Sequence, residues 1–87
     1  MNGAATQIAS RQFDVDFFSL PAQIQARIQA KIDKMGSRLA VFEHYRMTGS
    51  DQYRLRVSDY RVIYRFDQAR EEIYLIAIGH RREVYRG

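Results

Sequence analysis

The sequence predicts a single α+β domain over residues 1–87, in which an N-terminal helical hairpin packs on a small antiparallel β-sheet. Over residues 13–35 the apolar positions recur at the spacing of a helix, whereas over residues 53–78 they alternate with the period of a strand. A chain of 87 residues is long enough to bury one modest core and too short for two.

The first helix of the hairpin is predicted between Ser10 and Pro21. Ser10 offers a side-chain oxygen as an N-cap, and Phe13, Phe17 and Leu20 follow at helical spacing. Pro21 breaks this pattern but suits the first turn of another helix. We therefore expect two helices joined by a short connection.

The second helix is predicted from the segment AQIQARIQAKIDKMG. Ile24, Ile28, Ile32 and Met35 form one apolar stripe, and Gly36 follows as a stop signal. Such a stripe also suits a membrane surface or a partner protein. A helix packed on the sheet of its own chain is the interpretation we favour.

Three strands are predicted in the second half, at residues 53–57, 60–66 and 72–78. Ser58 and Asp59 form a tight turn between the first two strands, and Gly79 ends the third. Because Leu55 and Val57 need cover, the helices should lie on their face of the sheet. The opposite face of strand 53–57 is then open to solvent.

Two further segments carry weaker patterns. Residues 4–9 are weakly apolar and are typical of a short edge strand. Residues 37–50 contain Leu39, Val41 and Phe42 as apolar anchors and are otherwise typical of a loop or one helical turn.

The chain is basic, and its positive charge comes mainly from arginine. The formal net charge is +4, and twelve of the 14 basic residues are arginines. From Arg46 onward, nine arginines face six acids, so this half carries +3. Guanidinium groups are well suited to phosphate, which indicates a polyanionic partner such as nucleic acid. A basic surface that only improves solubility is the alternative.

Composition also argues against several classes of protein. The chain has no cysteine, and its only imidazoles, His44 and His80, lack the partners of a metal site, so we expect no metal and no other cofactor. The first dozen residues do not resemble a secretory signal, and the longest apolar run, residues 74–78, cannot span a membrane. We expect a cytoplasmic protein without a membrane partner.

Arg54 and Arg56 share the open face of their strand, with Cα atoms about 7 Å apart. Arg61 opens the next strand and should converge on them across the turn. Three guanidinium groups at close range repel one another unless an anion lies among them, which indicates a phosphate site. The alternative is a set of surface salt bridges, each worth about 0–1 kcal/mol. The candidate acids are Asp51, Asp59 and Glu72.

The tail after Gly79 contains groups that could act on a phosphate. His80, Arg81, Arg82 and Tyr85 all lie within six residues of that glycine. Clustered guanidinium groups can stabilise a five-coordinate phosphorus, and a histidine or tyrosine can transfer protons. In the structural alternative, Tyr85 anchors the chain terminus and His80 is a surface or capping residue.

The segments YRLRVSDYRVIYRFD and IAIGHRREVYR closely resemble the C-terminal half of the RelE/ParE superfamily of bacterial toxins. FDVDFFSLPAQIQARIQAKI is similar to the helical hairpin of that family, in which a leucine-proline pair joins the helices. Ser58 stands where glycine is usual in the family. We expect this departure to affect the turn more than the site.

The resemblance implies a curved sheet with helices on one side and a metal-independent endonuclease that cleaves messenger RNA in the ribosomal A site. Attack by the 2′-hydroxyl would leave a 2′,3′-cyclic phosphate. The catalytic residues that the resemblance implies are Arg54, Arg56, Arg61, Arg81 and Tyr85. We expect additional RNA contacts from Arg46, His80 and Arg82.

Proton transfer is expected from Tyr85 or His80. A guanidinium is almost never neutral, so Arg54 and Arg56 should stabilise charge and not carry protons.

The resemblance also implies partners: a cognate RelB-like antitoxin in a toxin–antitoxin hetero-oligomer, the ribosome and messenger RNA. Two other functions stay open at this level. ParE-type members share the fold but inhibit DNA gyrase without cleaving RNA. A basic RNA- or ribosome-binding module without chemistry would bind in a salt-sensitive way that does not depend on Tyr85.

Overall fold

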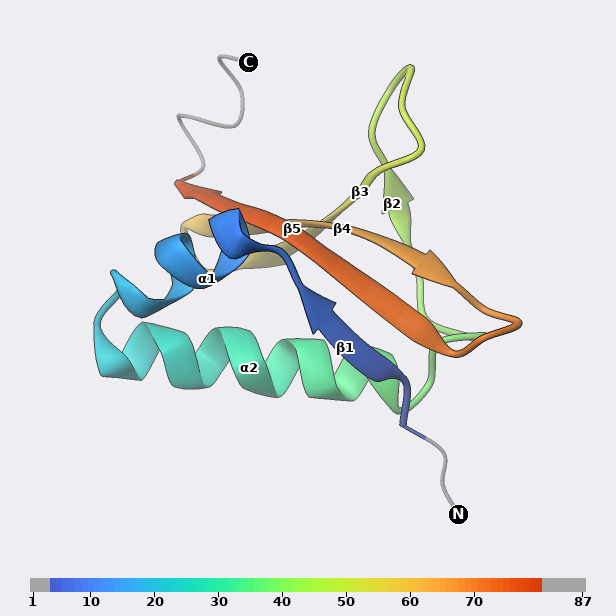
Figure 1. Cartoon of the computed structure of the whole chain (residues 1–87), viewed down its shortest axis with the longest axis horizontal. Helices are drawn as coiled ribbons and strands as arrows, with labels where there is room; N and C mark the ends of the chain where they lie inside the picture. The colour runs from blue at the N-terminus through green and yellow to red at the C-terminus, as the bar shows by residue number, and fades with distance from the viewer. Residues whose placement is uncertain (1–3, 81–87) are drawn as a thin grey trace.

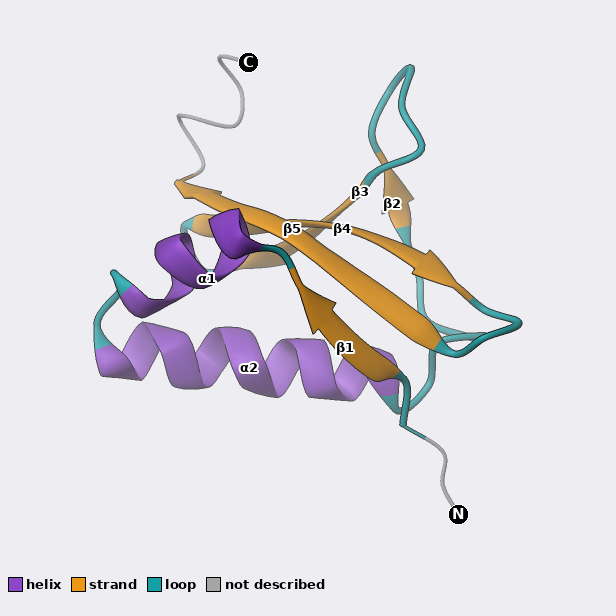
Figure 2. Ribbon diagram, in the orientation of Figure 1, coloured by secondary structure: helices purple, strands orange, loops and turns teal. Residues whose placement is uncertain are grey.

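The computed structural model describes residues 4–80 and confirms the α+β class. In chain order the elements are β1 (Thr6–Ala9), α1 (Arg11–Phe18), α2 (Ala22–Gly36), β2 (Tyr45–Arg46), β3 (Tyr53–Val57), β4 (Tyr60–Asp67) and β5 (Glu72–His80). The strands form one sheet in the order β1-β5-β4-β3-β2, with both helices on the same side of it (Figure 1). Figure 2 shows this division into a helical layer and a strand layer.

The predicted meander is confirmed and is extended by one strand at each edge. β3, β4 and β5 are antiparallel neighbours, and β2 adds a short antiparallel pairing to β3. β1 is the expected edge strand, but it pairs with β5 in parallel. The sheet is therefore mixed, and the prediction of a wholly antiparallel sheet is wrong at β1. Periodicity indicates that a segment is extended, but not the direction in which it pairs.

Helix α1 begins at the predicted N-cap and covers the edge of β5 beyond the end of β1. The side-chain oxygen of Ser10 accepts a hydrogen bond from the backbone of Phe13 at 3.0 Å and donates one to the carbonyl of Ile76 at 2.6 Å. Further along, the backbone N–H of Ile78 donates to the carboxylate of Asp16 at 2.9 Å. These contacts satisfy polar groups on an exposed strand edge and fix α1 to the sheet.

Helix α2 buries the predicted apolar stripe. Ile28, Ile32 and Met35 are fully buried, and the half-buried Ile24 packs against the same core. The predicted stop is also right, because Gly36 is the last residue of the helix. Within residues 4–80, neither helix is long and apolar enough to cross a membrane.

A β-bulge in β5 changes which of its side chains face the core. Ile63 and Tyr64, neighbours on β4, pair with Ala77 and Leu75, so that Ile76 is an extra residue on β5. Beyond the bulge, the positions whose side chains face the core are shifted by one residue. A regular alternation along the sequence does not predict this shift. The buried side chains of β5 are Ile73, Leu75 and Ile78.

The turn between β3 and β4 places Ser58 in the left-handed region of backbone conformation, with φ of 56°. Asp59, the second turn residue, has no positive φ, and this combination is that of a type II′ hairpin turn. Glycine occupies the left-handed region without steric strain, whereas other residues are penalised by about 1–2 kcal/mol. Serine therefore keeps the two-residue turn at the expense of local strain.

Replacing Ser58 with glycine should raise the free energy of unfolding by about 1 kcal/mol, because the strain at a positive φ is removed. In a domain of this size that corresponds to an increase in Tm of about 4–8 °C, measurable by circular dichroism. Asp59→Gly is the matched control and should not raise Tm, since Asp59 lacks a positive φ. An equal increase in both variants would contradict the assignment of strain to Ser58.

Residues 37–44 form a loop that His44 anchors to the sheet. Its Nε2 lies 2.9 Å from the carbonyl oxygen of Leu39 and must carry the proton, because a carbonyl can only accept. Its Nδ1 therefore accepts from the hydroxyl of Tyr64 at 2.6 Å. The imidazole also stacks on Phe66, with ring centroids 4.0 Å apart. Burial, and to a smaller extent Tyr53, raises the pKa of Tyr64, which keeps the phenol a neutral donor.

Tyr64→Phe should lower the free energy of unfolding by about 1–3 kcal/mol, because the Nδ1 atom of His44 loses its donor inside the protein. The raised pKa adds a pH dependence. In the unfolded chain the phenol ionises near pH 10, whereas in the folded protein it stays protonated to higher pH. The contribution of Tyr64 is therefore complete below about pH 10 and decreases as the pH rises further.

Denaturant unfolding at pH about 7 and between pH about 9 and 11 tests both effects. The native protein should lose more stability across the alkaline range than Tyr64→Phe. Tyr74→Phe is the control, because its hydroxyl bonds Glu72 and not the loop. If Tyr64→Phe and Tyr74→Phe were equally stable at pH about 7, the anchoring role of Tyr64 would be wrong.

Candidate functional site

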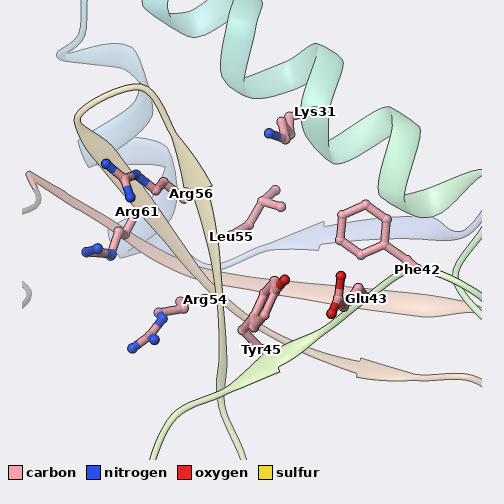
Figure 3. A pocket seen from close by; sticks show the side chains of 8 residues that line it. All are labelled: Lys31, Phe42, Glu43, Tyr45, Arg54, Leu55, Arg56 and Arg61. Carbon is pink, nitrogen blue, oxygen red and sulfur yellow. The ribbon is translucent and has the colours of Figure 1, made fainter.

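A groove of about 410 Å³ opens along the free edge of β3 (Figure 3). β2 pairs only with Tyr53 and Arg54, so the rest of β3 has no neighbouring strand on that side. Four cationic side chains and one carboxylate are among the residues that line the groove. The full set is Lys31, Phe42, Glu43, Tyr45, Arg54, Leu55, Arg56 and Arg61.

Three of the predicted site arginines meet in this groove. Arg54 and Arg56 are exposed on β3, and the register of the two strands places Arg56 directly opposite Arg61 of β4. Figure 3 shows the three guanidinium groups on one side of the strands, away from Lys31. Like charges directly opposite each other destabilise a strand pair, and a bound anion would relieve that repulsion.

Arg61 is buried, whereas the sequence predicts it on an open face. It is only 4% exposed, and Ile63, two positions along the same face of β4, is 9% exposed. The physical reason is the position of β4, which is flanked by β3 and β5 and is not an edge strand. Burial restricts the directions that the guanidinium of Arg61 can take.

Two of the three acids considered as salt-bridge partners contact other residues. Asp51 lies 3.4 Å from Arg65, and the carboxylate of Glu72 accepts a hydrogen bond from Tyr74. Within residues 4–80, no carboxylate, that of Asp59 included, lies within ion-pair distance of the two exposed arginines of β3. The salt-bridge alternative therefore does not account for these arginines.

Three groove residues, Lys31, Glu43 and Tyr45, are absent from the sequence-based predictions. Tyr45 is the cross-strand partner of Arg54, so both side chains lie on the same face of the sheet. A hydrogen bond to the carboxylate of Glu43 raises the pKa of Tyr45, which favours the neutral phenol. β2 has only two residues, too few for periodicity to indicate which face its side chains occupy.

Two predicted RNA-binding residues lie outside the groove. The guanidinium of Arg46 donates to the carbonyl of Ser50 at 2.8 Å, beside a separate hollow. His80 pairs with Tyr60, and their rings meet edge to face at 5.5 Å. Since Tyr60 packs against the core, His80 lies on the helix-bearing face, opposite to the arginines. β5 also continues through Gly79 to His80, so the predicted end of this strand is wrong.

The remaining predicted site residues, Arg81, Arg82 and Tyr85, lie outside the described residues, and their roles stay predictions. Within residues 4–80, the structure contains no group of three or more side chains suited to hold a metal ion.

The fold is that of RelE-type toxins. The chain is similar to the isolated RelE toxin of Escherichia coli, with a TM-score of 0.76, 17% identity and coverage of 95% of this chain and 93% of that chain. It is also similar to a chain of the RelE–RelB complex of Pyrococcus horikoshii, with a TM-score of 0.72 and 25% identity. That comparison covers 90% of this chain and 96% of that chain. It is similar as well to a chain of the RelBE2 toxin–antitoxin complex of Mycobacterium tuberculosis, with a TM-score of 0.73 and 20% identity. That comparison covers 93% of this chain and 95% of that chain.

The chain belongs to the family of ParE toxins of type II toxin–antitoxin systems, because the family model for the ParE toxin of parDE systems matches residues 8–85. Together with the structural neighbours, this match places the protein in the RelE/ParE superfamily, as the sequence motifs predict. A comparison with curated protein sequences gives no match.

Arg56→Gln should increase the free energy of unfolding by about 0.2–1 kcal/mol, because it removes the like-charged pair across β3 and β4. The same substitution should reduce stabilisation by inorganic sulfate, which at 100 times its Kd would add about 2.7 kcal/mol. Thermal unfolding in sulfate and in chloride of equal ionic strength measures both effects.

Arg70→Gln is the control for this measurement, because Arg70 is an exposed arginine in the turn between β4 and β5. It should leave the sulfate-dependent increase unchanged. If Arg56→Gln and Arg70→Gln responded to sulfate as the native protein does, the groove would not be an anion site.

Proposed function

We propose that this toxin is a metal-independent endoribonuclease that cleaves messenger RNA on the ribosome and so inhibits translation. The observation that carries the proposal is the pairing of Arg56 with the buried Arg61, beside Arg54, in a groove where the exposed arginines have no carboxylate partner among residues 4–80. Such a site has a net positive charge that a phosphodiester would balance.

The proposed reaction is an internal transfer within the RNA. The 2′-oxygen loses its proton and attacks the adjacent phosphorus, the bond to the 5′-oxygen breaks, and the 5′-oxygen takes up a proton as it leaves. Arg54 and Arg56 would contact the non-bridging oxygens, on which negative charge increases. Arg61, held in place by burial, would supply a positive charge that does not have to move as negative charge develops on the phosphate.

Proton transfer is proposed for Tyr85, with His80 as the second candidate. His80 packs against Tyr60 on the face of the sheet opposite to the arginines, which makes it a poorer donor to a phosphate in the groove. Arg81 and Arg82 would add positive charge from the same tail.

We also propose that an acidic, RelB-like antitoxin binds this toxin and forms a hetero-oligomer with it. Membership of a toxin–antitoxin family supports a partner of this type, and the neighbouring structures from Mycobacterium tuberculosis and Pyrococcus horikoshii are toxin–antitoxin complexes. Acidic residues of the antitoxin would complement the groove and compete there with RNA.

Cell-free translation with mapping of messenger-RNA ends tests the nuclease. The native protein should produce cuts in phase with codons, and Arg54→Gln or Arg56→Gln should each slow cleavage by about 10²–10³-fold, the usual effect of removing one preorganised charge. Tyr85→Phe should also slow cleavage, whereas Arg70→Gln should not. The two exposed arginines are chosen because their replacement does not disturb the core.

Intact messenger RNA together with inhibited DNA supercoiling would instead identify a gyrase inhibitor, the function of the ParE branch. RNA binding without cleavage, unchanged by Tyr85→Phe and weakened by salt, would identify a binding module. Either result would overturn the proposed nuclease.

A further inference from the structure

Tyr45 is an exposed aromatic side chain inside a charged groove. Of the five large apolar side chains that are well exposed within residues 4–80, it is the only one that lines this groove. Its ring is 54% exposed and contributes nothing to the core. Burial therefore does not explain its position.

The pairing of β2 with β3 determines where the ring lies. Tyr45 is directly opposite Arg54, and Arg56 is two residues further along β3 on the same face. Figure 3 shows the Tyr45 ring between the guanidinium of Arg54 and the carboxylate of Glu43. A flat aromatic surface thus lies immediately beside the proposed phosphate contacts.

The residue between Tyr45 and Glu43 is anchored to the rest of the fold. His44 is hydrogen-bonded to the carbonyl of Leu39 and to the hydroxyl of Tyr64, and the carboxylate of Glu43 lies beside the Tyr45 ring (Figure 3). The carboxylate of Glu43 would repel a phosphate at this end of the groove. The phosphate contacts and the aromatic contact are therefore separated along the groove, as the phosphate and the base are separated in a nucleotide.

We propose that Tyr45 is a stacking platform for one unpaired nucleobase of the RNA whose phosphate contacts Arg54 and Arg56. This inference rests on the proposed RNA-cleaving function and extends it to a base-binding subsite. Single-stranded RNA is commonly held by stacking of unpaired bases on aromatic side chains next to a cationic groove. Tyr45 contacts the base, and Glu43 lines the groove beside it.

The experiment measures binding of the full-length protein to a fluorescein-labelled single-stranded RNA octamer at low salt. Tyr45→Ala should weaken binding by about 5- to 150-fold, which corresponds to the roughly 1–3 kcal/mol assigned to one stacked base. Tyr45→Phe keeps the aromatic face and should bind within about threefold of the native protein, a difference below 1 kcal/mol. Phe18→Ala, which removes an exposed aromatic on α1 outside the groove, should have no effect.

A second measurement identifies the base. Octamers that lack one base at successive positions are compared with the intact octamer. One position should show a large loss with the native protein and little loss with Tyr45→Ala, because base and ring then contribute to the same interaction. Uniform losses in both proteins would overturn the platform, as would equal weakening by Tyr45→Phe and Tyr45→Ala.

Failure of this inference can be distinguished from failure of the proposed function. If Tyr45→Ala binds as the native protein does while Arg54→Gln and Arg56→Gln bind weakly, only the stacking platform is wrong. If the arginine variants also bind as tightly as the native protein, the groove is not the RNA site and both proposals are wrong.

Discussion

The register of β3 against β4 is the constraint on which the rest of the structure depends. On one face it sets Leu55 opposite Val62, both buried beneath the helical layer, and on the other it sets Arg56 opposite Arg61. A slip of one residue would exchange these faces and bury guanidinium groups in the core. The apolar core therefore fixes the positions of the two arginines that lie opposite each other in the groove.

The opposite wall of the groove depends on the aromatic side chains around His44, which pack against the core. His44 bridges the carbonyl of Leu39 and the hydroxyl of Tyr64 and stacks on Phe66, so the loop before β2 has a fixed path. That path determines where β2 begins and hence where the exposed Tyr45 lies. A polar network of this kind is stable only when each member has its partner, and here the imidazole contacts both the phenol of Tyr64 and the carbonyl of Leu39.

Two features of the β3–β4 hairpin are expected to reduce its local stability. Ser58 holds a strained backbone conformation at the turn, and two guanidinium groups face each other two positions away from it. Proteins commonly depart from locally optimal choices where function requires it, and the remaining fold compensates. Here the compensation comes from the central position of β4 and from the apolar stripe of α2, of which Ile28, Ile32 and Met35 are fully buried.

The sequence by itself determined the helices, the meander and the shared face of Arg54 and Arg56, because each follows from periodicity along a continuous segment. It did not determine the parallel pairing of β1 or the bulge in β5, since both depend on hydrogen bonds between strands distant in the chain. The burial of Arg61, the position of Tyr45 in the groove and the orientation of His80 away from it were decided by neighbouring elements. Local spacing defines the direction of a side chain relative to its own strand, whereas burial and proximity depend on which other segments pack around that strand.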